Sequence, residues 1–259
     1  MVVDSFSILK SKGWLIHTIE KPFYIDGSLF SSMDIFASKI IHLQSPSIFN
    51  ELYFYLMIRV EKLPNPLVFW AKEKELLHVF TDPISFADLI LLESTPILDP
   101  EKRESLLKLS HYHNSSIAKI GLVVYEPFKK RGENKIHEAI THIIDITNMF
   151  REYRASSSLM PDYKNSEKKP VNYLFICYSV IITNAKFYVV EFQDGAPSLF
   201  SSELMPFLTS KWVDSMLGGR LLRNFVIDFV NLHALDKYLE LLDDEIVAFS
   251  EKLSTMSTQ

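Results

Sequence analysis

The sequence predicts an α/β protein built on a mixed β-sheet that is flanked by helices. Segments with strand-like apolar runs alternate along the chain with segments whose apolar residues recur at helical spacing. The chain has only 7 glycines but 19 phenylalanines and 11 tyrosines, a composition that favours strands rich in aromatic side chains. The 259 residues suffice for one large domain, or for a core with an appended piece.

The first seventy residues predict a short helix and four strands. Residues 6–12 have apolar positions at helical spacing and stop at Gly13, since glycine commonly ends a helix. The strands are expected where apolar and β-branched or aromatic residues gather, and Pro64 and Pro66 close the third of them. They cover residues 14–19, 33–41, 52–60 and 67–71.

The rest of the chain predicts further helices and strands in alternation. Ser85 is a helix-capping residue, and Pro100 suits a first helical turn. Helices are expected over residues 85–92, 99–109, 134–154 and 235–253, and strands over residues 118–125, 173–182, 186–192 and 225–230.

The chain divides into three parts by composition. Residues 1–155 form the expected α/β core. Residues 156–170 are rich in serine, lysine and other polar residues, so we expect a linker or an exposed loop there. Residues 171–259 add strands and a closing helix, which either pack on the core or form a subdomain.

Composition excludes several classes of protein. The single cysteine, Cys177, rules out an internal disulfide and a cysteine-based zinc site, and fits a reducing, cytoplasmic setting. Apolar runs stay well short of the ~20 residues that span a bilayer, so no membrane association is expected. The net charge of −5 argues against wholesale coating of nucleic acid but not against a local basic groove.

The first seventy residues also carry a series of motifs: GWLIHTIEKPF, a turn at DGSL, then SSMDIFA, YLMIRVEK and NPLVFW. This series resembles the PD-(D/E)XK superfamily of restriction-endonuclease-like nucleases. The later segment YLFICYSVIITNAKFYVV resembles a strand pair of some prokaryotic members. The resemblance covers residues 5–72 and 172–193. It implies a restriction-endonuclease-like fold, extended by C-terminal strands and a closing helix, and a nucleic-acid substrate, either DNA or RNA.

The chemistry of such a site is that of a divalent metal. Hydrolysis of a phosphodiester uses a cation that polarises the phosphoryl oxygens and activates water, and Mg²⁺ prefers carboxylate ligands. Asp34 matches the first ligand of the motif, because it stands in an otherwise apolar segment where a carboxylate needs a partner. Alternatively, Asp34 lies at the start of the strand and is solvated or caps a turn.

The second half of the motif departs from the family pattern. Arg59 stands where the glutamate ligand is expected, and Glu61 stands where the lysine is expected. A guanidinium cannot ligate Mg²⁺, so we expect Arg59 to pair with Asp34 or Glu61. Asp34, Arg59 and Glu61 are the predicted site residues, with two interpretations. Either they form a catalytically silent ion network, or Asp34 and Glu61 still hold Mg²⁺ in an atypical arrangement.

A basic segment precedes the long helix over residues 134–154. Lys129, Lys130, Arg131 and Lys135 are candidates for contacts with nucleic-acid phosphates, although a charge run before a helix is commonly a solvated loop.

Three functions follow from these patterns. The leading hypothesis is a nuclease-fold protein, associated with nucleic acid, whose metal site is altered or inactive. The first alternative is an active Mg²⁺-dependent endonuclease that uses Asp34 and Glu61. The second is a non-catalytic structural or interaction module, because a fold does not dictate a function. Oligomeric state does not follow from the sequence.

Overall fold

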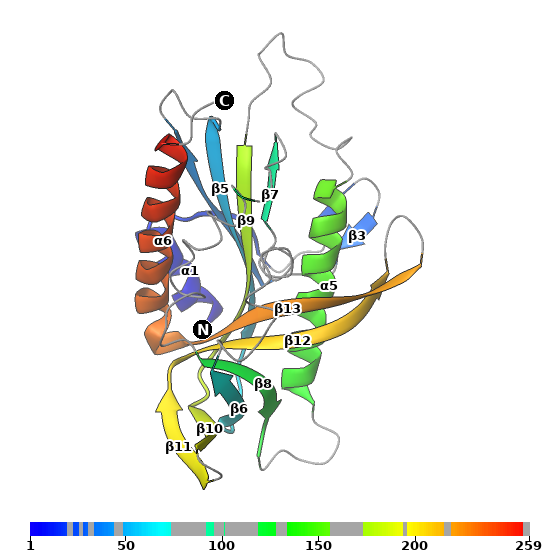
Figure 1. Ribbon diagram of the computed structural model, residues 1–259, viewed down its shortest axis with the longest axis vertical. Helices are drawn as coiled ribbons and strands as arrows, with labels where there is room; N and C mark the ends of the chain where they lie inside the picture. Colours follow the sequence, from blue (N-terminus) through cyan, green and yellow to red (C-terminus); the bar gives the residue numbers. More distant parts are fainter. Residues whose placement is uncertain are drawn as a thin grey trace.

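A computed structural model of the chain describes residues 1–19, 23–25, 28–30, 34–43, 49–73, 92–95, 101, 119–127, 134–155, 173–193, 196–214 and 219–255. Within these ranges the expected α/β class is confirmed, because helices cover a mixed sheet (Figure 1).

Among the described residues the large sheet has eleven strands, ten of them in the order β1-β4-β5-β9-β13-β12-β8-β6-β10-β11, and the eleventh, β7, pairs with β9. Strands β2 (Phe23–Ile25) and β3 (Ser28–Phe30) form a separate pair. The members of the large sheet are β1 (Leu15–Ile19), β4 (Ile35–His42), β5 (Glu51–Glu61), β6 (Leu67–Glu73), β7 (Leu92–Thr95), β8 (Lys119–Tyr125), β9 (Tyr173–Thr183), β10 (Phe187–Gln193), β11 (Ala196–Ser202), β12 (Leu204–Asp214) and β13 (Arg220–Asn231).

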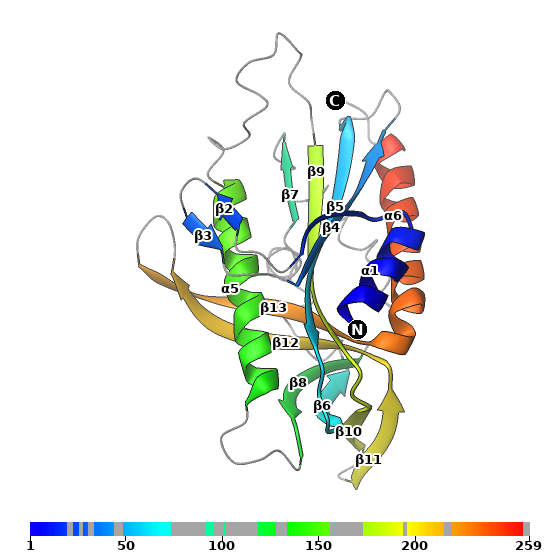
Figure 2. The ribbon, with the colours of Figure 1, turned by 180° about the vertical axis from the view of Figure 1, so that it is seen from behind.

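Helices lie on both faces of this sheet. Figures 1 and 2 show α1 (Val2–Ser11) and α6 (Leu235–Thr255) on one side of β5 and β9, and α5 (Lys135–Ala155) on the other. The short helix η4 (Leu232–Ala234) joins β13 to α6. We call the two sides the α6 face and the α5 face.

Strand β5 shows why the sheet needs helices on both sides. Its side chains alternate between the two faces, as in any strand. Phe54, Leu56 and Ile58 are buried in the cluster that includes α6, whereas Tyr55 and Met57 are buried in the cluster that includes α5. A strand buried on both faces reads as a continuous apolar run, which is how residues 52–58 appear in the sequence.

The C-terminal part of the chain lies inside the sheet rather than beside it. Strand β9 runs parallel to β5, with Glu51 opposite Tyr173 and Glu61 opposite Thr183. Strand β13 then runs parallel to β9 on its other side. Residues 171–259 therefore share one sheet with strands from residues 1–155.

The strands predicted around residues 14–19, 33–41, 52–60, 67–71 and 118–125 are confirmed as β1, β4, β5, β6 and β8. The helices predicted over residues 6–12, 134–154 and 235–253 are confirmed as α1, α5 and α6. The expected linker, residues 156–170, and most of the expected helices at 85–92 and 99–109 lie outside the described residues. Leu92 begins β7, so the helix prediction is wrong at that residue, and Glu101 is helical.

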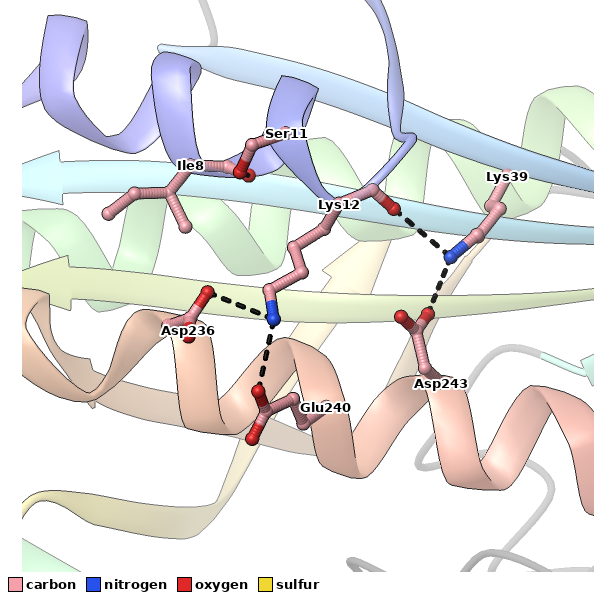
Figure 3. Close-up of polar contacts among 7 residues, drawn as sticks. All are labelled: Ile8, Ser11, Lys12, Lys39, Asp236, Glu240 and Asp243. Carbon is pink, nitrogen blue, oxygen red and sulfur yellow. Dashed lines mark hydrogen bonds and ion pairs between the residues drawn. The ribbon is translucent and has the colours of Figure 1, made fainter.

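Polar contacts fasten α6 to the opposite end of the chain. Lys12, just after α1, contacts Asp236 at 3.1 Å and Glu240 at 3.0 Å (Figure 3). Lys39 of β4 donates to Asp243 at 2.6 Å and to the Lys12 carbonyl at 3.2 Å. The neighbouring carboxylates raise the pKa of Lys12, so its ammonium stays charged.

Candidate functional site

Asp34 and Arg59 lie opposite each other on neighbouring strands. Ile35, the first residue of β4, pairs with Ile58 of β5, and the antiparallel register therefore places residue 34 opposite residue 59. Since side chains alternate along a strand, Arg59 lies on the α5 face together with Met57 and Tyr55. The α5 face of β5 thus changes from aromatic to charged toward the end of the strand.

The Arg59 guanidinium bridges two carboxylates. Its Nη1 lies 3.3 Å from Asp34 Oδ1, and its Nε donates to Glu61 Oε1 at 2.9 Å. The side chain of Arg59 is 28% exposed, and those of Asp34 and Glu61 are each 16% exposed. The predicted pairing of Arg59 with these carboxylates is confirmed. We call Asp34, Arg59 and Glu61 the Arg59 cluster.

Asp34 also accepts a backbone hydrogen bond. The Val60 N–H donates to Asp34 Oδ2 at 2.6 Å, while Oδ1 contacts Arg59. Both carboxylate oxygens thus have protein donors. Asp34 stands immediately before β4, as the alternative interpretation expects, but its carboxylate is paired within the protein rather than simply solvated.

The Arg59 cluster does not fit Mg²⁺ as it stands. Mg²⁺ needs oxygen ligands at about 2.0–2.1 Å in octahedral geometry. Here Asp34 and Glu61 direct oxygens at a fixed positive charge, which would repel a second cation. Across the described part of the chain, no three His, Cys, Asp or Glu side chains gather closely enough to hold a metal ion.

The lysine position of the motif holds no lysine. Glu61 is the last residue of β5 and turns its carboxylate back to Arg59, two residues earlier. Lys62, the next residue, is exposed and falls on the opposite side by strand alternation. The cluster therefore has a cation between two acids, where the family pattern has two acids followed by a cation.

The basic segment is described only at its end. Lys135 is the first residue of α5 and is exposed. Lys129, Lys130 and Arg131 lie outside the described residues. Their proposed contact with nucleic acid stays a prediction.

A second polar group, on the α6 face, does not figure in the sequence predictions. Tyr178 of β9 donates to Glu245 of α6, and Tyr238 of α6 donates to Asp228 of β13 at 2.8 Å. All four side chains are buried, with at most 2% of the residue exposed. We call these residues the tyrosine–carboxylate pairs. One feature of the sequence could have indicated this group. Asp228 lies within the apolar run FVIDFV, and a carboxylate at such a core position needs a partner.

The Tyr178 phenol is held in its neutral form. Burial raises its pKa well above 10.0, and the charges of Glu245 and Asp228 raise it further. A neutral phenol is a hydrogen-bond donor, so it can donate to one oxygen of a buried carboxylate without adding a second buried charge. This arrangement is suited to fixing the position of α6 on the sheet.

A histidine–serine contact joins β1 to the middle of β4. His17 Nε2 is 2.6 Å from Ser38 Oγ, and the His17 ring packs against Phe36 with 5.4 Å between ring centroids. Burial lowers the pKa of His17. Ser38 is only 1% exposed, so a substrate has no access to this hydroxyl and the pair is structural.

None of the helices among the described residues is long and apolar enough to cross a membrane. No protein-family model, curated protein or solved structure matches the chain.

Proposed function

We propose that this protein is a nuclease-fold protein that associates with nucleic acid and has exchanged its metal site for an ion-pair cluster. The observation that carries the proposal is Arg59, whose guanidinium lies between Asp34 and Glu61 at 3.3 and 2.9 Å. A guanidinium in the place of a ligand removes one oxygen donor and adds a charge that repels a metal.

The order of elements supports the resemblance on which this proposal depends. A short helix, α1, precedes three antiparallel strands, β1, β4 and β5, which are adjacent in the sheet. The aspartate of the motif lies at the start of the second strand and the Glu-x-Lys positions lie at the end of the third. Two ligands on neighbouring strand ends are what a two-carboxylate metal site requires.

The Arg59 cluster also has a structural effect that does not depend on catalysis. Arg59 and the Val60 N–H both contact Asp34, so the start of β4 is tied to the end of β5. A chain that no longer needs the metal retains a structural reason to keep Asp34.

Association with nucleic acid is proposed to depend on local basic residues, since the net charge is −5. Lys129, Lys130, Arg131 and Lys135 are the candidates, next to the start of α5. Either DNA or RNA could be the nucleic acid that these residues contact. We place the protein in the cytoplasm, because its single cysteine fits a reducing compartment.

The test is to restore the family order of charges. The double variant Arg59→Glu/Glu61→Lys places two carboxylates, at 34 and 59, beside a lysine at 61. We expect the wild-type chain to bind DNA or RNA, with affinity that falls as salt rises, and to cleave neither in Mg²⁺. The double variant should gain stabilisation by Mg²⁺ in thermal unfolding, and cleavage of the bound nucleic acid should be assayed in parallel. Arg59→Lys, which keeps the positive charge, is the matched control and should not respond to Mg²⁺.

Two outcomes would favour the alternatives. Mg²⁺-dependent cleavage by the wild-type chain that is lost in Asp34→Ala would support an active endonuclease using Asp34 and Glu61, and would require Arg59 to leave the cluster. Absence of nucleic-acid binding at any salt concentration would support a non-catalytic structural or interaction module.

A further inference from the structure

Helix α1 packs beside α6 with little buried apolar surface. Of its side chains only Leu9, which is apolar, and Ser5, which is polar, are fully buried, while Val2 and Ile8 are partly buried against the same core. The helix has 10 residues, fewer than the roughly 12–15 that an isolated helix needs in water, so its stability depends on these contacts. Helix α6, by contrast, has 21 residues and buries apolar side chains along its whole length.

Two buried polar atoms lie where α1 meets the core. Ser5 Oγ and Trp14 Nε1 have no hydrogen-bond partner within the described part of the chain, although Ser5 is 0% exposed and Trp14 is 3% exposed. A buried polar group without a partner raises the free energy of the closed state, because water would satisfy it in an open one. The packing under α1 therefore stabilises the closed state less than its buried area implies.

Two lysines hold α1 to α6 through ion pairs (Figure 3). Lys12 Nζ lies 3.1 Å from an Asp236 oxygen and 3.0 Å from a Glu240 oxygen. Lys39 Nζ lies 2.6 Å from Asp243 Oδ1 and donates to the Lys12 carbonyl at 3.2 Å. The two lysine side chains are 24% and 22% exposed, so water and salt screen these contacts.

Gly13 provides a hinge between α1 and β1. Its φ is 78°, a conformation that favours glycine, and no atom lies within 4 Å of the position that a side chain would take. Hinges are commonly a few residues at the end of an element that absorb a backbone rotation. Rotation at Gly13 breaks the hydrogen bond from the Trp14 N–H to the Leu9 carbonyl, while β1 stays paired with β4.

We infer that α1 is a strap that opens and closes as a unit on a folded sheet, and that Lys12 and Lys39 form the latch that holds it closed. Because the latch is electrostatic, salt shifts the strap toward its open state. Helix α6 stays in place, since the buried tyrosine–carboxylate pairs join it to β9 and β13. The open state exposes Trp14 and the part of the core that Leu9 covers. Such local openings have free energies below that of global unfolding.

Hydrogen exchange of the full chain, followed by mass spectrometry, tests the latch. We expect the amides of α1 to exchange at least about tenfold faster than those of α6, and faster still as salt rises from ~0.05 to ~0.5 M. Lys12→Met removes both ion pairs and should accelerate exchange in α1 by about two- to fivefold at low salt, but little at high salt. Lys211→Met is the matched control, because Lys211 pairs with Asp145 of α5 and is 30% exposed. It should leave α1 unchanged.

A change of the opposite sign tests the packing under the strap. Ser5→Ala removes a buried hydroxyl that has no partner among the described residues, so it should slow exchange in α1 by about fivefold or more. Ser7→Ala is the matched control, since Ser7 is exposed on the same helix and the substitution brings the same gain in helix propensity. Its effect should be smaller.

Trp14 fluorescence gives a second measurement of the strap. In the variant Trp70→Phe/Trp212→Phe, which replaces two exposed tryptophans, Trp14 is the one tryptophan that remains. Its quenching by acrylamide should increase with salt while the far-ultraviolet circular dichroism stays that of the folded chain. The inference is overturned if α1 exchanges as slowly as α6, because α1 would then open only with global unfolding. It is also overturned if Lys12→Met and Lys211→Met change exchange in α1 equally, or if Ser5→Ala accelerates it.

Discussion

The two faces of the sheet hold their carboxylates in different ways. On the α5 face, Asp34 and Glu61 share the Arg59 guanidinium, and the three side chains are between 16% and 28% exposed. On the α6 face, Glu245 and Asp228 are buried and accept hydrogen bonds from tyrosine phenols. The partly exposed cluster pairs charge with charge, whereas the buried carboxylates use neutral donors.

This difference predicts different roles for the two groups of carboxylates. Ion pairs near the surface are screened by water and salt, and contribute little to folding. Hydrogen bonds to buried charged groups are worth more, because their loss leaves the group desolvated. The tyrosine–carboxylate pairs should therefore matter for the free energy of unfolding. The Arg59 cluster should matter for what the protein can bind.

The largest expected effect on stability is that of Tyr178→Phe. The change removes the phenol that donates to Glu245 and should lower the free energy of unfolding by about 1–3 kcal/mol. Urea denaturation followed by circular dichroism measures the loss, which should persist at high salt. Tyr53→Phe is the matched control, because Tyr53 donates to Glu51, whose side chain is 21% exposed. An equal or larger loss in Tyr53→Phe would show that burial does not distinguish the two pairs.

Arg59→Gln should have a smaller effect on stability and a qualitative effect on binding. Loss of the partly exposed ion pairs should lower the free energy of unfolding by less than about 1 kcal/mol. With the guanidinium removed, Asp34 and Glu61 become available as oxygen ligands, so Mg²⁺ should raise the melting temperature of the variant but not of the wild-type chain. The double variant Arg59→Gln/Glu61→Gln should lose that response. An unchanged melting temperature of Arg59→Gln in Mg²⁺ would mean that the two carboxylates do not converge on one ion.

The Arg59 cluster could be predicted from the sequence because it depends on local geometry. Antiparallel neighbours with fixed alternation place Asp34 and Arg59 on one face once their strands are assigned. The pair between Tyr178 and Glu245 could not be predicted in this way, since it joins β9 to α6 across 67 residues. Which helix covers which face is decided by tertiary packing, which periodicity alone does not determine.

Tertiary packing that periodicity does not determine also explains why some strands were not predicted from the sequence. Strand β12 contains Pro206, an unusual residue inside a sheet, and β12 pairs with β13 along its whole length. β13 begins at Arg220, five residues before the predicted start at 225. Residues 220–222 are exposed, so this first part of the strand lacks the buried apolar pattern on which the prediction depended. Gly219 has a φ of 89° just before β13, a conformation that favours glycine.

The smallest expected effect is a pH dependence carried by His17, on the α5 face beside Phe36. Burial lowers the pKa of His17 from 6.5, so the folded chain holds this proton more weakly than the unfolded chain does. The contribution to the free energy of unfolding is therefore complete above pH 6.5 and is lost as the pH falls toward the folded-state pKa. His17→Gln should reduce the fall in melting temperature between roughly pH 7 and pH 5. His137→Gln, on α5, is the matched control and should leave that fall unchanged. If both variants behave alike, the acid sensitivity of the protein arises elsewhere than at His17.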